Sequence, residues 1–342
     1  MSPPSTLAPN AAAPVPGDKL LRRLITAMLL GVLVYAGFAL YGGIADIGER
    51  LARYSWSTLA IACALALGNY VLRYFKWEYY LAKLGIRGVP KLDSFLVFLS
   101  GFVLTVTPGK VGEVFKSFLL YEKHEVPIAR TAPIVVAERL TDVIGVVALI
   151  LMGTSGFPGG VTWAIAGGVL VLLALAAIGS ERVVNFSISL LEKLPGRFRS
   201  LAPKVREAWE SLRVVTTPRA LVWPSVLSIV AWWLEGIALW MILKGFDEPV
   251  PMPLACFFYA TATLAGALVP IPGGLGITEG ALEEQLTLLG GVTGATATSA
   301  MILVRFATLW LAVLVGFVAF GIWRAKYPKV ARSSVMATGE GQ

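Results

Sequence analysis

Two stretches decide the fold of this chain: TPGKVGE at residues 107–113 and PIPGGLGITEG at residues 270–280. Both contain the pattern Pro-Gly-x-x-Gly, which begins at residue 108 and again, 164 residues later, at residue 272. Proline removes a backbone donor and clashes with the preceding turn, so each pattern predicts a break in a helix. The predicted break residues are Pro108, Gly109, Gly112, Pro272, Gly273 and Gly276.

Apolar residues surround both breaks and dominate the whole chain. Of its 342 residues, 56% are hydrophobic and 15% are charged, which is typical of a membrane protein. A helix needs about 20 apolar residues to cross a hydrocarbon core of roughly 30 Å. We therefore expect spans at Leu24–Ile44, Trp56–Leu72, Thr131–Met152, Val161–Ile178, Leu221–Leu243 and Ala295–Trp323. The first is interpreted as a retained anchor, because no small-residue cleavage site follows it.

Lysine and arginine collect in particular segments between the apolar runs. These segments lie before the first span, at 73–91, 116–130 and 182–219, and after residue 323. The positive-inside rule assigns them to the cytoplasm and the loops at 45–55, 153–160 and 244–248 to the outside. We expect a multi-pass protein of the cell inner membrane with both termini cytoplasmic. The same rule accounts for the net charge of +8 without nucleic acid.

Two segments, 92–121 and 252–290, each hold two apolar stretches that are too short to cross comfortably. Each is predicted to be a re-entrant hairpin that enters, breaks and returns, the first from the cytoplasm and the second from outside. Irregular backbone at membrane depth is tolerated only where it is buried in protein or lines a wet cavity. Both hairpins therefore mark an interior site, unless each pattern is only a kink whose small residues let helices pack closely.

The two halves of the chain repeat one another. Besides the break pattern, the starts of the preceding spans, Trp56 and Leu221, and two following arginines, Arg139 and Arg305, recur at nearly the same offset. The predicted fold is an all-α polytopic membrane protein with about six full spans and two oppositely oriented re-entrant helical hairpins in an inverted internal repeat. The predicted parts are a disordered cytoplasmic tail (1–18), a first membrane repeat (19–152), a second membrane repeat (153–323) with a cytoplasmic amphipathic segment (181–219), and a cytoplasmic tail (324–342).

Charged residues lie in and beside the hairpins. A charge near the bilayer centre costs about 2.5–3.5 kcal/mol on insertion scales, so such residues face partners or a cavity. The candidate substrate-binding residues are Lys110, Glu113, Glu138, Arg139, Asp142, Glu279 and Arg305. Arginine suits bidentate binding of phosphate. The alternative, about equally weighted for any one residue, is a set of internal salt bridges that tie the halves together.

Some of these side chains have a predicted direction. Glu138 and Asp142 are four residues apart and share a helix face, whereas Arg139 points about 100° away towards other neighbours. Arg73, Lys76 and Glu78, among several aromatic residues, are interpreted mainly as anchors that snorkel to the membrane interface.

The motifs TPGKVGE (107–113), AERLTD (137–142) and PIPGGLGITEG (270–280) resemble those of the lysylphosphatidylglycerol synthase transmembrane region, or flippase-like, family. The resemblance runs from about residue 19 to residue 323. It implies a lipid-handling role, because in the multiple peptide resistance factor this module moves an aminoacylated phosphatidylglycerol between leaflets. Other members are linked to hopanoid, isoprenoid or glycolipid pathways. Without a soluble aminoacyl-transferase domain in this sequence, a separate enzyme is expected to make the lipid.

The resulting functional hypothesis is a lipid flippase or transporter for a phosphate-bearing phospholipid, with no enzyme activity and no cofactor. The phosphate would lie near Arg139, Arg305 and Lys110. The first alternative is an intramembrane enzyme or accessory protein of polyprenyl, hopanoid or glycolipid metabolism, although the only histidine, His124, lies in a predicted turn. The second is a small-solute secondary transporter. A homo-oligomer is left open, and no metal site is expected, because Cys63 and Cys256 have no ligand spacing.

Overall fold

The computed structural model describes residues 43–106, 113–153, 202–269 and 271–328, with scattered positions between 31 and 40 and between 165 and 189. Within these ranges all regular structure is helical. In chain order the principal helices are α2 (Ile44–Ala52), α3 (Trp56–Lys83), α4 (Lys91–Ser100), η1 (Gly101–Leu104), α5 (Phe115–His124), α6 (Ile128–Thr131), α7 (Pro133–Gly153), α10 (Ala202–Val215), α11 (Pro218–Gly245), α12 (Met252–Leu268), η5 (Pro272–Gly274), α13 (Ile277–Leu288), α14 (Gly294–Arg305), η6 (Phe306–Trp310) and α15 (Leu311–Lys326).

Three helical segments in the described part of the chain are long and apolar enough to cross a membrane. They are α3 and α11, each of 28 residues, and the continuous segment from α14 to α15, of 33 residues. At 1.5 Å per residue, each is longer than a hydrocarbon core of roughly 30 Å. They confirm the predicted spans at 56–72, 221–243 and 295–323. The chain is therefore an all-helical, multi-pass membrane protein.

The other predicted spans have different outcomes. Helix α7 coincides with the predicted span 131–152 but carries two acids and an arginine, so its crossing stays a prediction. Most of 24–44 and of 161–178 lies outside the described residues, as do the terminal tail 1–18 and all but the start of the tail 324–342. The predicted outer loop 45–55 is instead mainly helix α2, with an acid in its first turn and a base in its last, as the helix dipole favours.

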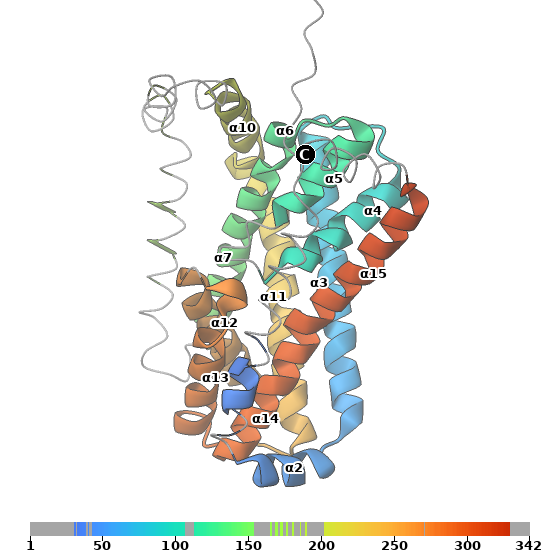
Figure 1. Cartoon of the computed structure of the whole chain (residues 1–342). Helices are drawn as coiled ribbons and strands as arrows, with labels where there is room; N and C mark the ends of the chain where they lie inside the picture. The colour runs from blue at the N-terminus through green and yellow to red at the C-terminus, as the bar shows by residue number, and fades with distance from the viewer. Residues whose placement is uncertain are drawn as a thin grey trace, which may run out of the picture.

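Helix α11 packs along α3, α7 and α12, and these helices form the centre of the molecule (Figure 1). Glycines permit the close approach. A Cβ atom at Gly145 of α7 would lie 2.9 Å from the Ser228 carbonyl oxygen, and one at Gly236 of α11 would lie 3.0 Å from the Cα atom of Cys256. Close packing through small residues is the usual way in which membrane helices associate.

Segments that the sequence predicts on the same side of the membrane lie at the same end of the molecule. At one end of the molecule Asp93 binds Lys326, and α10 packs on α6 and α7 (Figure 1). At the other end the Ser55 amide donates to the Gly245 carbonyl, and α14 contacts α2. Segments that the positive-inside rule assigns to one side thus share one end of the fold. Helix α10 falls within the predicted amphipathic segment 181–219, of which residues 181–201 lie almost wholly outside the described part.

The end of α15 is held by a polar cluster that we call the α15 latch: Asp93, His124, Lys326 and Tyr327. Lys326 Nζ and Tyr327 Oη each donate to the Asp93 carboxylate at 2.6 Å, and His124 Nε2 lies 3.3 Å from it. Although burial acts in the opposite direction, hydrogen bonds from Lys326 and Tyr327 hold the pKa of Asp93 below its usual value. The latch thus favours the ionised carboxylate.

Two units of helix, break and helix occupy opposite halves of the view in Figure 1, with α4 and α5 above and α12 and α13 below. The break between α12 and α13 is present where Pro272, Gly273 and Gly276 predicted it, and both glycines have positive φ (63° and 88°). Pro108, Gly109 and Gly112 lie outside the described residues.

The two units meet inside the fold. Val106, the last described residue of the first unit before its break, forms a buried cluster with Leu275, Leu309 and Val313. A Cβ atom at Gly273 would lie 3.3 Å from Val106 Cγ1. The backbone break between α12 and α13 therefore packs against Val106, just after η1.

A π-helical segment, η6, joins α14 to α15. It begins directly after Arg305, and π segments are frequent at functional sites. Within η6, the carbonyl of Thr308 accepts a hydrogen bond from Tyr70 Oη of α3 at 3.3 Å. The irregularity thus links the C-terminal helix to the central helix α3.

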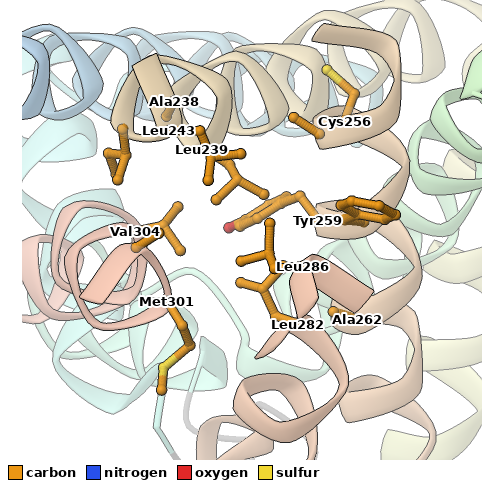
Figure 2. Close-up of a cluster of buried hydrophobic side chains, with 14 of the residues drawn as sticks. Ala238, Leu239, Leu243, Cys256, Tyr259, Ala262, Leu282, Leu286, Met301 and Val304 are labelled. Carbon is orange, nitrogen blue, oxygen red and sulfur yellow. The ribbon is translucent and has the colours of Figure 1, made fainter. Parts of the chain in front are cut away.

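Within the described residues, apolar side chains fill four buried clusters and also cover the outside. Figure 2 shows the largest buried cluster, in which leucines of α11 and α13 surround Tyr259 of α12. On the outer surface, large apolar side chains are exposed along α3, α11 and α15: Ile61, Leu67, Val71, Phe75, Val222, Trp223, Val226, Val230, Leu314, Phe317, Val318 and Ile322. Exposure on this scale fits contact with lipid tails rather than with water.

Candidate functional site

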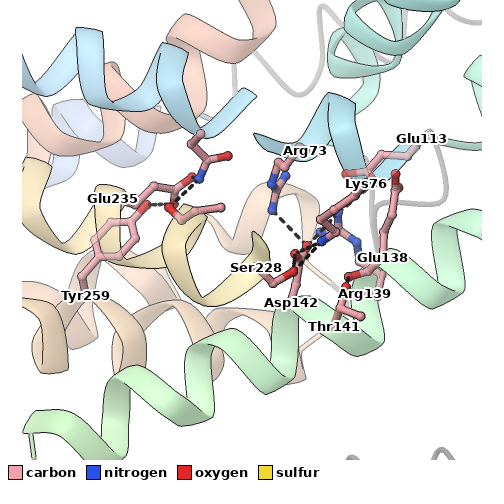
Figure 3. A network of polar contacts seen from close by, with 12 residues as sticks. Arg73, Lys76, Glu113, Glu138, Arg139, Thr141, Asp142, Ser228, Glu235 and Tyr259 are labelled. Carbon is pink, nitrogen blue, oxygen red and sulfur yellow. Dashed lines mark hydrogen bonds and ion pairs between the residues drawn. The ribbon is translucent and has the colours of Figure 1, made fainter. Parts of the chain in front are cut away.

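A cluster of charged side chains lies between α3, α5, α7 and α11 (Figure 3). Much of it lines one small pocket, which we call the charged pocket. Its lining residues are Arg73, Lys76, Phe98, Gly101, Phe102, Glu113, Lys116, Glu138 and Arg139.

Asp142 is the centre of the charges behind the pocket. Its carboxylate contacts three cations, at 2.9 Å from Arg73, 2.8 Å from Lys76 and 3.0 Å from Arg139. Ser228 of α11 accepts a hydrogen bond from Lys76 Nζ at 2.6 Å and donates to Asp142 at 3.2 Å. Because Asp142 is 4% exposed, this is a buried ion cluster whose members depend on one another.

A second group of ion pairs closes the other side of the pocket. Lys116 of α5 donates to Glu138 at 2.5 Å, and its ammonium lies 4.6 Å from the centre of the Trp77 ring. Arg139 lies 3.2 Å from Glu113. At 27% exposure, the Arg139 side chain is the most accessible member of the ion pairs in the pocket.

The described residues around the pocket carry an excess of positive charge. Four cations face three carboxylates, the cations being Arg73, Lys76, Lys116 and Arg139 and the carboxylates Glu113, Glu138 and Asp142. In addition, Nε of Arg73 and Nε of Arg139 are buried donors without a hydrogen-bond partner, and Glu138 Oε1 is an acceptor without one. Unsatisfied buried donors are costly, so an anion with several oxygens, such as a phosphate, would complete the pocket.

The structure brings together four of the seven predicted site residues here: Glu113, Glu138, Arg139 and Asp142. Glu138, Arg139 and Asp142 lie on α7 with the predicted spacing, and Arg139 faces a neighbour, Glu113, that Glu138 does not contact, but it also has a partner on α7 that the predicted direction did not include. Arg139 reaches Asp142 on its own helix as well as Glu113, because a long arginine side chain spans three residues along a helix. Lys110 lies outside the described residues.

The interpretation of Arg73 and Lys76 as anchors that snorkel to the membrane interface is wrong. Lys76 is 1% exposed, and both residues bind Asp142 inside the protein. The reason is that α3 continues past Leu72 to Lys83, so these positions lie within the helix and not at its end. The available signal was the spacing of Asn69, Arg73 and Lys76, which places three polar residues on one face of an apolar helix. Glu78 binds Lys91 and Ser94 at the helix end.

The remaining predicted residues, Glu279 and Arg305, form a separate pair. Arg305 Nε donates to Glu279 at 2.6 Å, and another guanidinium nitrogen donates to the Gly273 carbonyl at 2.7 Å. The other Glu279 oxygen accepts from the Gly276 amide at 2.7 Å, which caps the start of α13. The pair therefore fastens the helix break within the second half of the chain, whereas the alternative of internal salt bridges expected such pairs to tie the two halves together.

Each of the two arginines, Arg139 and Arg305, forms an ion pair with a glutamate of its own half of the chain. Arg139 pairs with Glu113 and Arg305 pairs with Glu279. Both members of the second pair follow those of the first by 166 residues. Equivalent positions in the two halves of the chain thus make equivalent ion pairs.

A third polar cluster was not predicted. Glu235 of α11 accepts hydrogen bonds from Asn69 Nδ2 of α3 at 2.7 Å and from Tyr259 Oη of α12 at 2.6 Å (Figure 3). All three side chains are buried. Within the described ranges, no group of three or more His, Cys, Asp or Glu residues could hold a metal ion.

Comparison with known proteins gives one family and several distant relatives. The family described as "Lysylphosphatidylglycerol synthase TM region" matches residues 28–316. A UPF0104 membrane protein of Methanocaldococcus jannaschii is 25% identical over 227 residues, which cover 65% of this chain and 94% of that protein. Another, of Methanothermobacter thermautotrophicus, is 20% identical and covers 90% of this chain and 96% of that protein. A Haloferax volcanii protein named glycosyltransferase AglD is 22% identical, over 82% of this chain but only 51% of its own length.

Proposed function

We propose that this chain, which belongs to the lysylphosphatidylglycerol synthase transmembrane-region family, moves a phosphate-bearing phospholipid between the leaflets of the cytoplasmic membrane. The observation that carries the proposal is the charged pocket. It combines an excess of cations with two unpartnered guanidinium donors inside a helical membrane protein. Charges at such a place are costly and point to function.

The pocket suggests a role for each side chain. Arg139, the most accessible cation of the ion pairs, and Arg73 would direct their free Nε donors at the phosphate oxygens, since guanidinium groups bind phosphate well. Lys116 would add a positive charge from beside the aromatic ring of Trp77. Glu113 and Glu138 would contact hydroxyl or amino groups of the headgroup, and Lys110 would contribute from the segment beyond the described residues. Aminoacyl-phosphatidylglycerol is one lipid of this class.

The architecture supports a route between leaflets. We propose that the helix–break–helix units are the predicted re-entrant hairpins and that the halves form an inverted repeat, with both termini cytoplasmic. In support, equivalent ion pairs recur at an offset of 166 residues, and the break at Gly273 packs against Val106. Inverted repeats of this kind operate by alternating access around a site near the midplane. The lipid tails would stay on the apolar outer surface.

A second candidate rests on the relative named glycosyltransferase. As a second proposal, the chain serves polyprenyl, hopanoid or glycolipid metabolism as an enzyme or accessory protein. The support is its similarity to that relative, of which it matches about half the length. The two candidates differ in what they do to the lipid. A transporter changes its leaflet and leaves it chemically intact, whereas an enzyme changes its mass. A small-solute transporter would move a water-soluble anion instead.

The test is reconstitution in liposomes that carry labelled phosphatidylglycerol and lysyl-phosphatidylglycerol, with leaflet exchange as the readout. We expect exchange by the wild type, loss in Arg139→Ala, and wild-type exchange in Arg324→Ala, which changes an exposed arginine on α15. Equal exchange in wild type, both variants and protein-free liposomes would refute translocation. A lipid product of altered mass after addition of a sugar donor would favour the enzyme.

A further inference from the structure

Glu235 is a titratable group that the proposed phosphate site does not use. It is the eighteenth of the 28 residues of α11 and is 8% exposed. Its two oxygens accept hydrogen bonds from neutral donors, Asn69 at 2.7 Å and Tyr259 at 2.6 Å. Burial penalises the ionised form of a carboxyl group, whereas hydrogen bonds from neutral donors and the nearby charge of Arg73 favour it.

The neighbouring amide can serve both protonation states. Asn69 Nδ2 also donates to the Ala231 carbonyl at 2.9 Å, whereas Asn69 Oδ1 is buried and has no hydrogen-bond partner. A carboxylate only accepts, but a protonated carboxylic acid also donates. If Glu235 were neutral, a half-turn of the Asn69 amide would let Oδ1 accept the new O–H, at the cost of the Nδ2 hydrogen bond to the Ala231 carbonyl. The unpaired oxygen is thus an available acceptor for a protonated Glu235.

Glu235 also lies where the two halves of the chain meet. Asn69 and Glu235 are separated by 166 residues, the offset that relates the two arginine–glutamate pairs. When two equivalent positions of a twofold repeat touch each other, they lie at the symmetry axis. With the proposed inverted repeat, the hydrogen bond between them puts Glu235 at the axis that relates the charged pocket to the Arg305 pair.

The groups around Glu235 connect it to both sites. From α3, Arg73 and Tyr70 interact electrostatically with it, and from α12 Tyr259 does so directly. Farther from Glu235, Asp142 of α7 forms an ion pair with Arg73. Arg305, at the end of α14, interacts electrostatically with Tyr259. Figure 3 shows Arg73 between the Glu235 cluster and Asp142.

We propose that Glu235 is a proton-binding site whose protonation is linked to binding of the lipid phosphate in the charged pocket, an inference that rests on the translocation proposed above. The step forms one O–H bond on the carboxylate with a proton from water on one side, and breaks it by release to water on the other. No other bond changes. The transported lipid would then move together with a proton.

The linkage follows from charge. Protonation of Glu235 removes one negative charge beside Arg73 and so makes the pocket more attractive to an anion. By reciprocity, an anion in the pocket favours the protonated acid by the same factor. Couplings of this kind commonly amount to about tenfold. The opposing reading is that Glu235 only ties α3, α11 and α12 together, in which case its charge would not respond to ligand.

The first experiment follows protonation directly, in purified protein, by the infrared carbonyl band of protonated carboxylic acids across a pH series. We expect a titrating band that is lost in Glu235→Gln and kept in Glu283→Gln, a matched buried carboxyl that accepts a hydrogen bond from Thr298 at 2.5 Å. Short-chain phosphatidylglycerol should shift the band's midpoint about one unit to higher pH, which is the tenfold linkage. Identical bands in wild type and Glu235→Gln, or no shift with lipid, would overturn the inference.

The second experiment imposes a pH difference across the liposomes used for lipid exchange. Wild type should accumulate labelled lipid in one leaflet, whereas Glu235→Gln should only equilibrate it and Glu235→Asp should recover part of the bias. Wild-type exchange that ignores the pH difference would refute the inference and leave translocation standing. Absence of all lipid exchange, together with a band that inorganic phosphate shifts, would refute translocation but support the proton-linked anion site.

Discussion

Replacement of Asp142 by Asn tests the most connected side chain of the charged pocket. The amide keeps the size of the side chain and can still hydrogen-bond Ser228, but it removes the charge that faces Arg73, Lys76 and Arg139. The described cluster would change from four cations against three carboxylates to four against two. The variant therefore isolates the electrostatic role of Asp142.

The expected loss follows from the burial of the pairs. Removal of one partner from a buried ion pair costs about 3–5 kcal/mol, because the other charge is left without compensation. The side chain of Lys76 is 1% exposed and that of Asp142 6%, so this pair falls within that range, whereas the Arg139 side chain, at 27%, contributes less. We expect Asp142→Asn to lower the free energy of unfolding by about 4 kcal/mol.

The double variant Lys76→Met, Asp142→Asn removes the buried pair and restores an excess of one positive charge. Loss of both partners is far less costly than loss of one, so the double variant should recover most of the stability. Unfolding by sodium dodecyl sulfate in mixed micelles, followed by tryptophan fluorescence, gives the free energies of wild type, of the single variants Asp142→Asn and Lys76→Met, and of the double variant. The exposed Asp46→Asn is the control and should change stability by less than about 0.5 kcal/mol. A loss below about 1 kcal/mol for Asp142→Asn, or strict additivity in the double variant, would refute the reasoning.

Three further predictions concern the rest of the fold. Arg305→Lys keeps the charge but cannot make both hydrogen bonds of the guanidinium, so the thermal midpoint should fall by an amount equivalent to about 1–3 kcal/mol; an unchanged midpoint would contradict the anchoring role. Gly273→Ala places a side chain at φ 63° and should cost about 1–2 kcal/mol in the same assay, with a neutral effect as the contrary result. The α15 latch should depend on pH: because hydrogen bonds from Lys326 and Tyr327 keep the pKa of Asp93 low, its stabilisation is complete above an unfolded value of about 3.9 and disappears as pH falls through the lower folded value. Asp93→Asn should flatten stability between about pH 4 and lower pH, and an unchanged acid profile would exclude this origin.

The helical class and the breaks could be predicted because their signals are local. Runs of apolar residues identify α3, α11 and α15, and Pro272 with its following glycines identifies the second break. The ends of helices were harder to predict from the sequence. The apolar run of α3 stops at Leu72, but tertiary packing carries the helix on to Lys83.

Because the end of α3 was predicted too early, part of the charged pocket was missed. Arg73 and Lys76 lie past the apolar run, so composition alone places them at the interface, whereas the structure pairs them with Asp142 from a distant helix. Glu235 was missed for a related reason. A single acid in an apolar run has no local partner, and its contacts with Asn69 and Tyr259 exist only after α3, α11 and α12 pack.

Glu113, Glu138, Arg139 and Asp142 could be recognised because charges in apolar segments are rare and their spacing places them on neighbouring turns. Which of them meet could not be read from that spacing. The pair of Arg139 with Glu113 depends on how the residues just before α5 lie against α7, which no pattern within α7 specifies.

The π segment η6 has a consequence for the phase of the long C-terminal helix. Successive residues of an α-helix are rotated by about 100°, and a π segment accommodates one additional residue within the turn. Arg305 can therefore face the second break while Gly316, farther along, still faces η1, where a Cβ atom would lie 2.6 Å from the Val103 amide nitrogen. Deletion of one residue from Phe306–Trp310 would restore a uniform helix and turn the surface of α15 by about 100° relative to α14. This short irregularity thus sets the rotation of α15, with its Gly316 contact, relative to α14, with its Arg305 contact.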